Sequence, residues 1–262
     1  MINAIHDAKF WDASADYRTT AQDFTQFYSR CALDLAQVPP HAQVLDVACG
    51  GGALTQCAAE AGHTVLATDF SQGMVDAVAE RRWPGVTARV MDGQALDLPD
   101  TSFDAAFSMF GIMLFPDWNA GLAELARVLR PGGIACIGTW KEPGGAAVNL
   151  LVDQMNKEHF PDLAIPSAVP GMVEWTDRKR FAAALTGVGL GQLAFHEVTS
   201  TFVLDQATLA NPERVFQFSP IWPELSDGQQ AELLAAMHEQ MQAGDGTIAI
   251  PSTAVIAVGR KD

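Results

Sequence analysis

The chain has 262 residues, of which 31 are acidic and 16 are basic, so its formal net charge is −15. This charge repels nucleic-acid phosphates and anionic membrane surfaces, so neither is expected as a partner. The sequence shows no apolar run of about 20 residues that could cross a membrane, and no leader segment is visible at Met1. We expect a cytoplasmic monomer or homodimer that acts on a small molecule, with one enlarged domain over residues 1–262.

Apolar residues at helical spacing predict one or two helices between Phe10 and Val38. Short apolar runs then alternate with helical segments as far as Trp140. The turn Arg130-Pro131-Gly132-Gly133 is expected just before the fifth strand. This alternation predicts a Rossmann-like, doubly wound α/β sheet with right-handed crossovers. The predicted strands are 43–47, 64–68, 87–91, 103–108 and 134–140, and the predicted helices between them are 53–61, 73–82 and 119–129.

The pattern loosens after Trp140, where helices are predicted near 146–160, 177–188 and 227–242. Two more strand candidates, 193–203 and 247–258, complete a seven-stranded, mostly parallel sheet with an antiparallel edge hairpin. The domain then divides into an N-terminal helical lid (1–40), a cofactor-binding core (41–140) and a substrate side (141–262).

A glycine-rich loop, Asp46-Val47-Ala48-Cys49-Gly50-Gly51-Gly52, joins the first strand to the next helix. Glycine lets a ligand approach the main chain, and the helix start offers unpaired N–H groups. The loop also satisfies a relaxed dinucleotide fingerprint, with Asp69 about 20 residues later, so a nicotinamide cofactor is one interpretation. Asp46 favours a different interpretation, because a carboxylate at this position suits a cationic ligand and not a pyrophosphate. S-adenosylmethionine, with its ammonium and sulfonium groups, is such a ligand.

The sequence resembles the class I S-adenosylmethionine-dependent methyltransferases from about Trp11 to Trp140. Ala48 departs from the family pattern, where glycine is common. The family's blocks recur in order as Val44 to Gly52, Ala67-Thr68-Asp69-Phe70-Ser71, Asp92-Gly93-Gln94-Ala95-Leu96, Pro99-Asp100-Thr101-Ser102-Phe103-Asp104 and Leu129-Arg130-Pro131-Gly132-Gly133.

The resemblance implies a role for each matching position. Asp46 and the glycine loop would hold the methionine moiety, and Asp69 the ribose hydroxyls. Phe70 and Met74 would pack against the adenine, and Asp92 would receive its exocyclic amine. The resulting cofactor-binding set is Trp11, Tyr17, Asp46, Ala48, Cys49, Gly50, Gly52, Asp69, Phe70, Ser71, Met74, Asp92, Gly93, Gln94 and Met109.

The loop after the fourth strand, Met109 to Trp118, is unusually apolar and in the family borders the transferred methyl group. Together with more distant aromatic side chains it indicates a hydrophobic acceptor. The candidate substrate-binding residues are Phe110, Met113, Trp140 and Trp222.

Methyl transfer from a sulfonium is an in-line displacement in which alignment and desolvation supply most of the acceleration, so a general base is optional. His196 and His238 are interpreted as surface or strand residues, and no catalytic residue is predicted. The four cysteines show no metal-ligand spacing, so no metal is expected. The sequence thus predicts methyl transfer to an O, N, S or C nucleophile of a small hydrophobic molecule, with S-adenosylhomocysteine as product. A nicotinamide-dependent reductase and a cofactor-binding protein without turnover remain alternatives.

Overall fold

A computed structural model describes residues 4–12, 22–163 and 170–262, and its centre is a seven-stranded sheet. The strand order is β3-β2-β1-β4-β5-β7-β6. The first five strands run parallel, and β7 runs antiparallel to both β5 and β6. The predicted Rossmann-like sheet with its antiparallel hairpin at one edge is therefore confirmed. The strands are β1 (Gln43–Val47), β2 (Thr64–Asp69), β3 (Val86–Val90), β4 (Phe103–Met109), β5 (Leu129–Trp140), β6 (Leu190–Asp205) and β7 (Thr247–Lys261).

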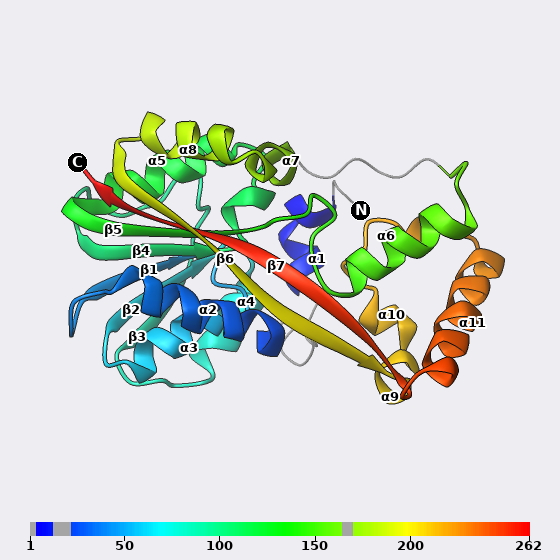
Figure 1. Ribbon diagram of the computed structural model, residues 1–262. Coiled ribbons are helices and arrows are strands. Elements are labelled where there is room, and N and C mark those ends of the chain that lie inside the picture. The colour runs from blue at the N-terminus through cyan, green and yellow to red at the C-terminus, as the bar shows by residue number, and fades with distance from the viewer. Residues whose placement is uncertain (1–3, 13–21, 164–169) are drawn as a thin grey trace.

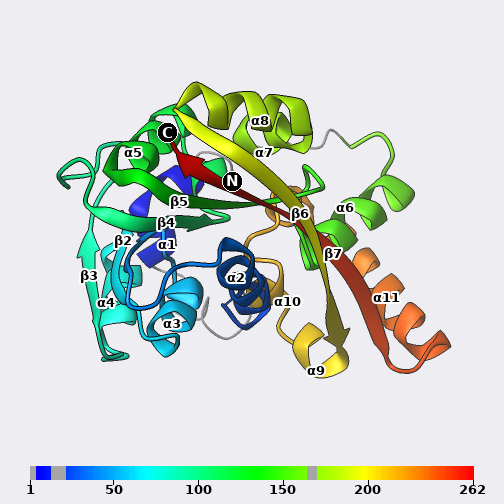
Figure 2. The same cartoon turned by 60° about the vertical axis from the view of Figure 1, so that its left-hand side comes forward.

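Helices cover both faces of the sheet. In Figures 1 and 2, α2, α3 and α4 lie on one face, and α5, α7 and α8 lie on the other. No described helix is both long enough and apolar enough to span a bilayer. The helices are α1 (Ala8–Asp12), α2 (Asp23–Ala36), α3 (Ala53–Glu60), α4 (Gln72–Ala79), α5 (Trp118–Val128), α6 (Val148–His159), α7 (Pro170–Thr176), α8 (Arg178–Gly187), α9 (Gln206–Leu209), α10 (Pro212–Val215) and α11 (Asp227–Ala243), with 3-10 turns η1 (Ala4–His6), η3 (Ile112–Leu114) and η4 (Trp222–Glu224).

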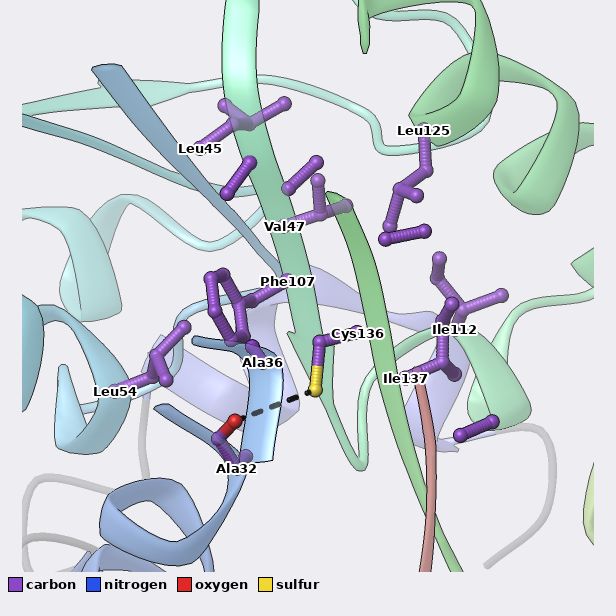
Figure 3. Packing of buried hydrophobic residues seen from close by; sticks show 14 of the residues in the cluster. Ala32, Ala36, Leu45, Val47, Leu54, Phe107, Ile112, Leu125, Cys136 and Ile137 are labelled. Atoms are coloured by element: carbon purple, nitrogen blue, oxygen red, sulfur yellow. Dashed lines mark hydrogen bonds between the residues drawn. The ribbon is translucent and has the colours of Figure 1, made fainter. Parts of the chain in front are cut away.

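The main core lies between the sheet and these two helix layers. Its strands are apolar on both faces, as parallel strands covered by helices must be. Figure 3 shows Phe107 of β4 on the side of Leu54 in α3, whereas Ile137 of β5 lies on the opposite face of the sheet. Cys136 is fully buried, and its thiol points to the carbonyl of Ala32 in α2.

A second core lies beyond the sheet, at the far end of the β6 and β7 hairpin. Only residues 254–260 of β7 pair with β5, whereas the β6 and β7 pairing continues to Asp205 and Thr247. The extended hairpin carries α6, α9, α10, η4 and α11, which together we call the cap (Figure 1). The buried side chains of the cap include Leu151, Met155, Phe216, Trp222, Leu233, Met237 and Ile248.

One predicted boundary is wrong. Residues 130–133, expected as a tight turn before the fifth strand, lie inside β5. The ladder with β4 shifts register there, from Phe103 opposite Leu129 to Ala105 opposite Ile134. Gly132 takes a left-handed φ of 75°, so the turn residues form an irregularity within the strand.

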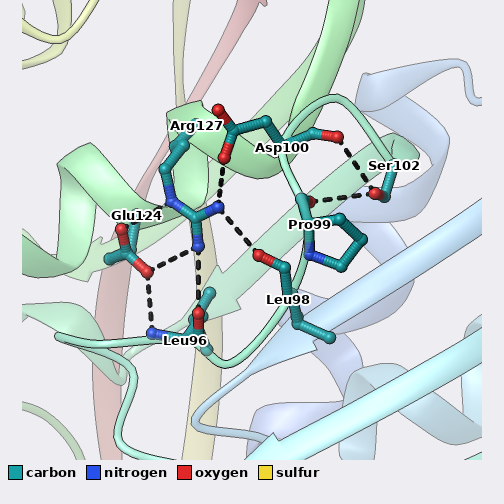
Figure 4. A network of polar contacts seen from close by, with 7 residues as sticks. All are labelled: Leu96, Leu98, Pro99, Asp100, Ser102, Glu124 and Arg127. Carbon is teal, nitrogen blue, oxygen red and sulfur yellow. Dashed lines mark hydrogen bonds and ion pairs between the residues drawn. The ribbon is translucent and has the colours of Figure 1, made fainter.

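The connection from β3 to β4 is fastened to α5 by Arg127. Its guanidinium donates to the carbonyls of Leu96 and Leu98 at 3.0 and 2.8 Å. It also pairs with the carboxylates of Glu124 and Asp100, as Figure 4 shows. These bonds hold the loop that follows the end of β3, where three of the cofactor-binding candidates lie.

Candidate functional site

The glycine-rich loop turns sharply between β1 and α3. Ala48, Gly50 and Gly52 have φ angles of 57°, 52° and 88°, all left-handed. A Cβ atom on Gly52 would lie 3.0 Å from Trp83 and Val78, so this position has room only for glycine. The loop can follow this path because glycine tolerates positive φ, while Ala48 carries a strain that glycine would not.

Two buried carboxylates stand beside this loop. Asp46 is 1% exposed, and one of its oxygens accepts hydrogen bonds from the Thr55 hydroxyl at 2.6 Å and the Thr55 amide at 3.1 Å. Burial raises the pKa of Asp46 to about 7. Asp69, at the end of β2, accepts from the amides of Gly50 at 2.9 Å and Ser71 at 3.0 Å. Burial also raises the pKa of Asp69.

A narrow pocket of about 30 Å³ opens between the loop and α2. Five predicted cofactor-binding residues line it. Six were not predicted, and three of these are polar residues from the first half of α2 and the position before it, where a polar side chain is usually exposed or a cap. The lining residues are Gln22, Thr25, Ser29, Asp46, Ala48, Cys49, Gly50, Gly51, Ala53, Leu54 and Met109.

The N-terminal helix α1 lies across the start of α4. The carboxylate of Asp12 accepts hydrogen bonds from the Ser71 hydroxyl at 2.6 Å and the Gly73 amide at 2.9 Å. The predicted residue Trp11 stacks on Phe218 of the cap, with ring centroids 5.5 Å apart. The helix thus touches both the β2 end and the cap. Tyr17, the other predicted lid residue, lies outside the described residues.

The remaining adenine-side candidates lie at the ends of β2 and β3. Met74 is buried in α4, and Phe70 is half-buried at the end of β2. Asp92 is exposed and accepts from the Gln94 amide at 2.9 Å. Gly93 is buried so close to Phe115 that a Cβ atom would lie 2.6 Å from that ring.

Two of the four acceptor-side candidates stack on each other. Phe110 and Trp140 lie with their ring centroids 3.9 Å apart at an angle of 10°. Tyr28 of α2 meets both rings edge-on, and its hydroxyl donates to the carbonyl of Ser252 at 2.7 Å. Phe110 directly follows Met109, which lines the pocket. The third candidate, Met113, is buried in η3 with its sulfur 3.3 Å from the Thr139 hydroxyl.

The fourth acceptor candidate, Trp222, lies apart from these in the core of the cap, 4.4 Å from the ring of Phe216. The two histidines considered as bases are also distant from the pocket lining. His196 lies on β6 opposite Ile256, and the exposed side chain of His238 on α11 contacts the carbonyl of Leu234. Among the described residues, no group of three or more His, Cys, Asp or Glu side chains could hold a metal ion.

A family model described as a methyltransferase domain matches residues 45–137. The demethylmenaquinone methyltransferase of Mycolicibacterium vanbaalenii is 30% identical over 213 residues, which cover 78% of this chain and 91% of that protein. The chain belongs to the class I S-adenosylmethionine-dependent methyltransferases. Membership of this family confirms the methyltransferase interpretation over the nicotinamide one.

Solved structures share the fold at low identity. The YcgJ protein of Bacillus subtilis has a TM-score of 0.56 and 17% identity, covering 90% of this chain and 98% of its own. Phosphoethanolamine N-methyltransferase 2 of Haemonchus contortus, solved with phosphomonomethylethanolamine and S-adenosylhomocysteine, has a TM-score of 0.53 and 17% identity, covering 90% of this chain and 52% of its own. These likenesses support the sheet topology described above.

Proposed function

We propose that this methyltransferase methylates a small, apolar, aromatic acceptor of the quinol class. The observation that carries the proposal is the aromatic and apolar surrounding of Met109, where the buried rings of Phe110 and Trp140 stack on each other and meet Tyr28 edge-on, because sites for flat apolar rings are lined mainly by apolar and aromatic side chains. A relative that is 30% identical is named for demethylmenaquinone, a quinone, which supports the same class of acceptor.

The residues around the pocket fit S-adenosylmethionine, which supplies a methyl group already activated on a sulfonium. Asp46 and the left-handed loop offer a buried carboxylate and a closely approachable main chain to the methionine end. Asp69 stands at the end of β2, where a ribose would be bound by the switch-point rule. Phe70 and Met74 then serve the adenine ring, with Asp92, Gly93 and Gln94 at its polar edge.

The chain's residues act mainly by positioning and by excluding water. Helix α1, part of the proposed lid, is held at the start of α4 by the Asp12 bonds to Ser71 and Gly73, and Trp11 stacks on Phe218. In the transfer, the acceptor's nucleophilic atom forms a bond to the methyl carbon as the carbon–sulfur bond breaks, and the acceptor loses one proton. The titratable side chains in the pocket lining, Asp46 and Cys49, are both buried, so the proposal assigns no general base.

The first experiment is isothermal titration with S-adenosylhomocysteine and, separately, with NADH and NADPH. We expect micromolar binding of the first ligand alone. Methyl transfer would then be followed by mass spectrometry with a reduced naphthoquinol, its oxidised quinone and an aliphatic amine of similar size. Only the electron-rich quinol should gain 14 mass units, since the oxidised ring is not a nucleophile. Methylation of the amine alone would overturn the proposed acceptor class.

A further inference from the structure

Gln22 carries a buried oxygen that no residue in the described ranges satisfies. The residue immediately precedes α2, is 4% exposed and makes no capping bond to the helix. Its Oε1 atom has no hydrogen-bond partner within the described part of the chain. A buried polar atom of this kind is costly to leave unpaired, so a donor from a bound molecule is the natural partner.

The side chain belongs to the wall of the pocket that faces the glycine loop. Gln22 and Asp46 line the same pocket, Gln22 from the position before α2 and Asp46 from β1. Outside the pocket lining, α2 is tied to α3, since Gln26 of α2 donates from Nε2 to Oε1 of Gln56 in α3 at 2.9 Å. Arg30 pairs with Glu60 at 3.2 Å at the other end of the same two helices.

The polar groups that line this pocket offer acceptor oxygens, so they favour a ligand group that donates hydrogen bonds. The hydroxyl of Thr25 donates to the Gln22 carbonyl at 3.1 Å, and that of Ser29 donates to the Thr25 carbonyl at 3.0 Å. Asp46 adds a carboxylate, and no Lys or Arg appears among the described lining residues. An ammonium group, with three N–H donors and a positive charge, matches two acceptor oxygens in one small pocket.

We propose that Gln22 Oε1 accepts a hydrogen bond from the α-ammonium group of S-adenosylmethionine and shares that group with Asp46. This inference rests on the proposed function and adds a residue that recognises the amino-acid end of the cofactor. Gln22 acts as a binding and selecting residue and takes no part in the transfer itself.

The test compares two ligands on purified full-length variants by titration calorimetry. S-adenosylhomocysteine carries the ammonium group, and 5′-methylthioadenosine shares its adenosine and thioether but has no amino-acid end. Gln22→Leu should lower the affinity for S-adenosylhomocysteine about tenfold, because a hydrogen bond to a charged group is lost. The affinity for methylthioadenosine should change less than twofold. Gln22→Glu, which keeps an acceptor oxygen, should restore most of the affinity.

Gln26→Leu is the matched control, because it removes the same amide from the same helix outside the pocket lining; both affinities should stay within twofold of wild type. An S-adenosylhomocysteine analogue lacking only its amino group should bind wild type and Gln22→Leu equally. Equal weakening of all three ligands by Gln22→Leu, or of none, would overturn the inference while leaving the function intact. Failure of wild type to bind S-adenosylhomocysteine would overturn both.

Discussion

Around the sheet, the buried acids are held by the chain's own hydrogen bonds, whereas two polar side chains of the cap are buried without a partner in the described chain. Asp46 is bonded by Thr55, and Asp69 by two loop amides. In the described part of the cap, neither the amide of Asn156 nor the indole nitrogen of Trp222 has a partner, although both residues are at least 97% buried. The comparison teaches that the cofactor side is preorganised by local main-chain bonds, while the cap is held mainly by apolar packing.

The largest effects are expected when each core is weakened separately. Leu233→Ala in the cap and Leu125→Ala beneath the sheet both truncate fully buried leucines, and each should cost about 2–5 kcal/mol of unfolding free energy. In native-state hydrogen exchange, Leu233→Ala should lower the protection of amides in the cap alone. Its affinity for S-adenosylhomocysteine should stay within twofold of wild type. Equal loss of protection across the sheet would mean that both cores unfold as one unit.

The next effect concerns pH. Because burial raises the pKa of Asp46 to about 7, its charging costs the fold stability progressively as pH rises from about 4 to 7. Asp46→Asn keeps the bonds from Thr55 and removes the charge, so it should stabilise the ligand-free protein by about 2–4 kcal/mol at pH 7.5 and have no effect at pH 4. Denaturant unfolding at both values measures this difference.

Asp104→Asn is the control of opposite sign. The Gln43 amide and then Arg130 lower the pKa of Asp104, so its charge stabilises the fold at neutral pH and this contribution fades as pH falls through the lowered pKa. The variant should therefore be less stable than wild type at pH 7.5. A shift of the same sign in both variants would contradict the assignment to Asp46.

Asp69 offers a test of the cofactor side alone. Asp69→Ala should lower the affinity for S-adenosylhomocysteine at least tenfold, or about 1.5–3 kcal/mol. The variant lacks the charged acceptor proposed for the ribose, and the Gly50 amide loses its hydrogen-bond partner. Titration calorimetry measures the affinity, and a thermal melt checks folding. Wild-type affinity in a folded variant would remove Asp69 from the proposed site.

The smallest effect is expected in the cap. Asn156→Leu replaces an amide that is fully buried and unpartnered in the described chain, so it should stabilise the protein by about 1 kcal/mol. Asn149→Leu, on the same helix, removes a bond from Nδ2 to the Phe218 carbonyl and should destabilise it. Thermal melts of both variants measure the contrast. Destabilisation by Asn156→Leu would show that its amide is satisfied in solution.

The sequence predicted the sheet and the acids at its strand ends because their signals are local. Asp46 and Asp69 each follow an apolar run directly, and Gly50 and Gly52 mark a turn that needs positive φ. Gln22 was missed, because nothing in a helix-start glutamine shows that its side chain is buried.

The cap could not be predicted, because its core joins residues far apart along the chain. Leu151, Trp222 and Ile248 come from three separate segments, and no periodicity links them. Trp222 was read as part of an acceptor wall for the same reason, since its burial depends on tertiary contacts alone. Residues 130–133 lie within β5 because the residues on both sides of them pair with β4: Leu129 pairs with Phe103, and Ile134 pairs with Ala105.

The long hairpin also determines how this enzyme can be rebuilt. Residues 206–246 leave the sheet at Asp205 and return at Thr247, which are directly opposite each other in the β6 and β7 ladder. A segment that starts and ends at paired positions can be exchanged for another without moving the strands that carry it. Chimeras made at this junction would keep the glycine loop and both acids while replacing α9, α10 and α11, and α6 would then need a new apolar partner.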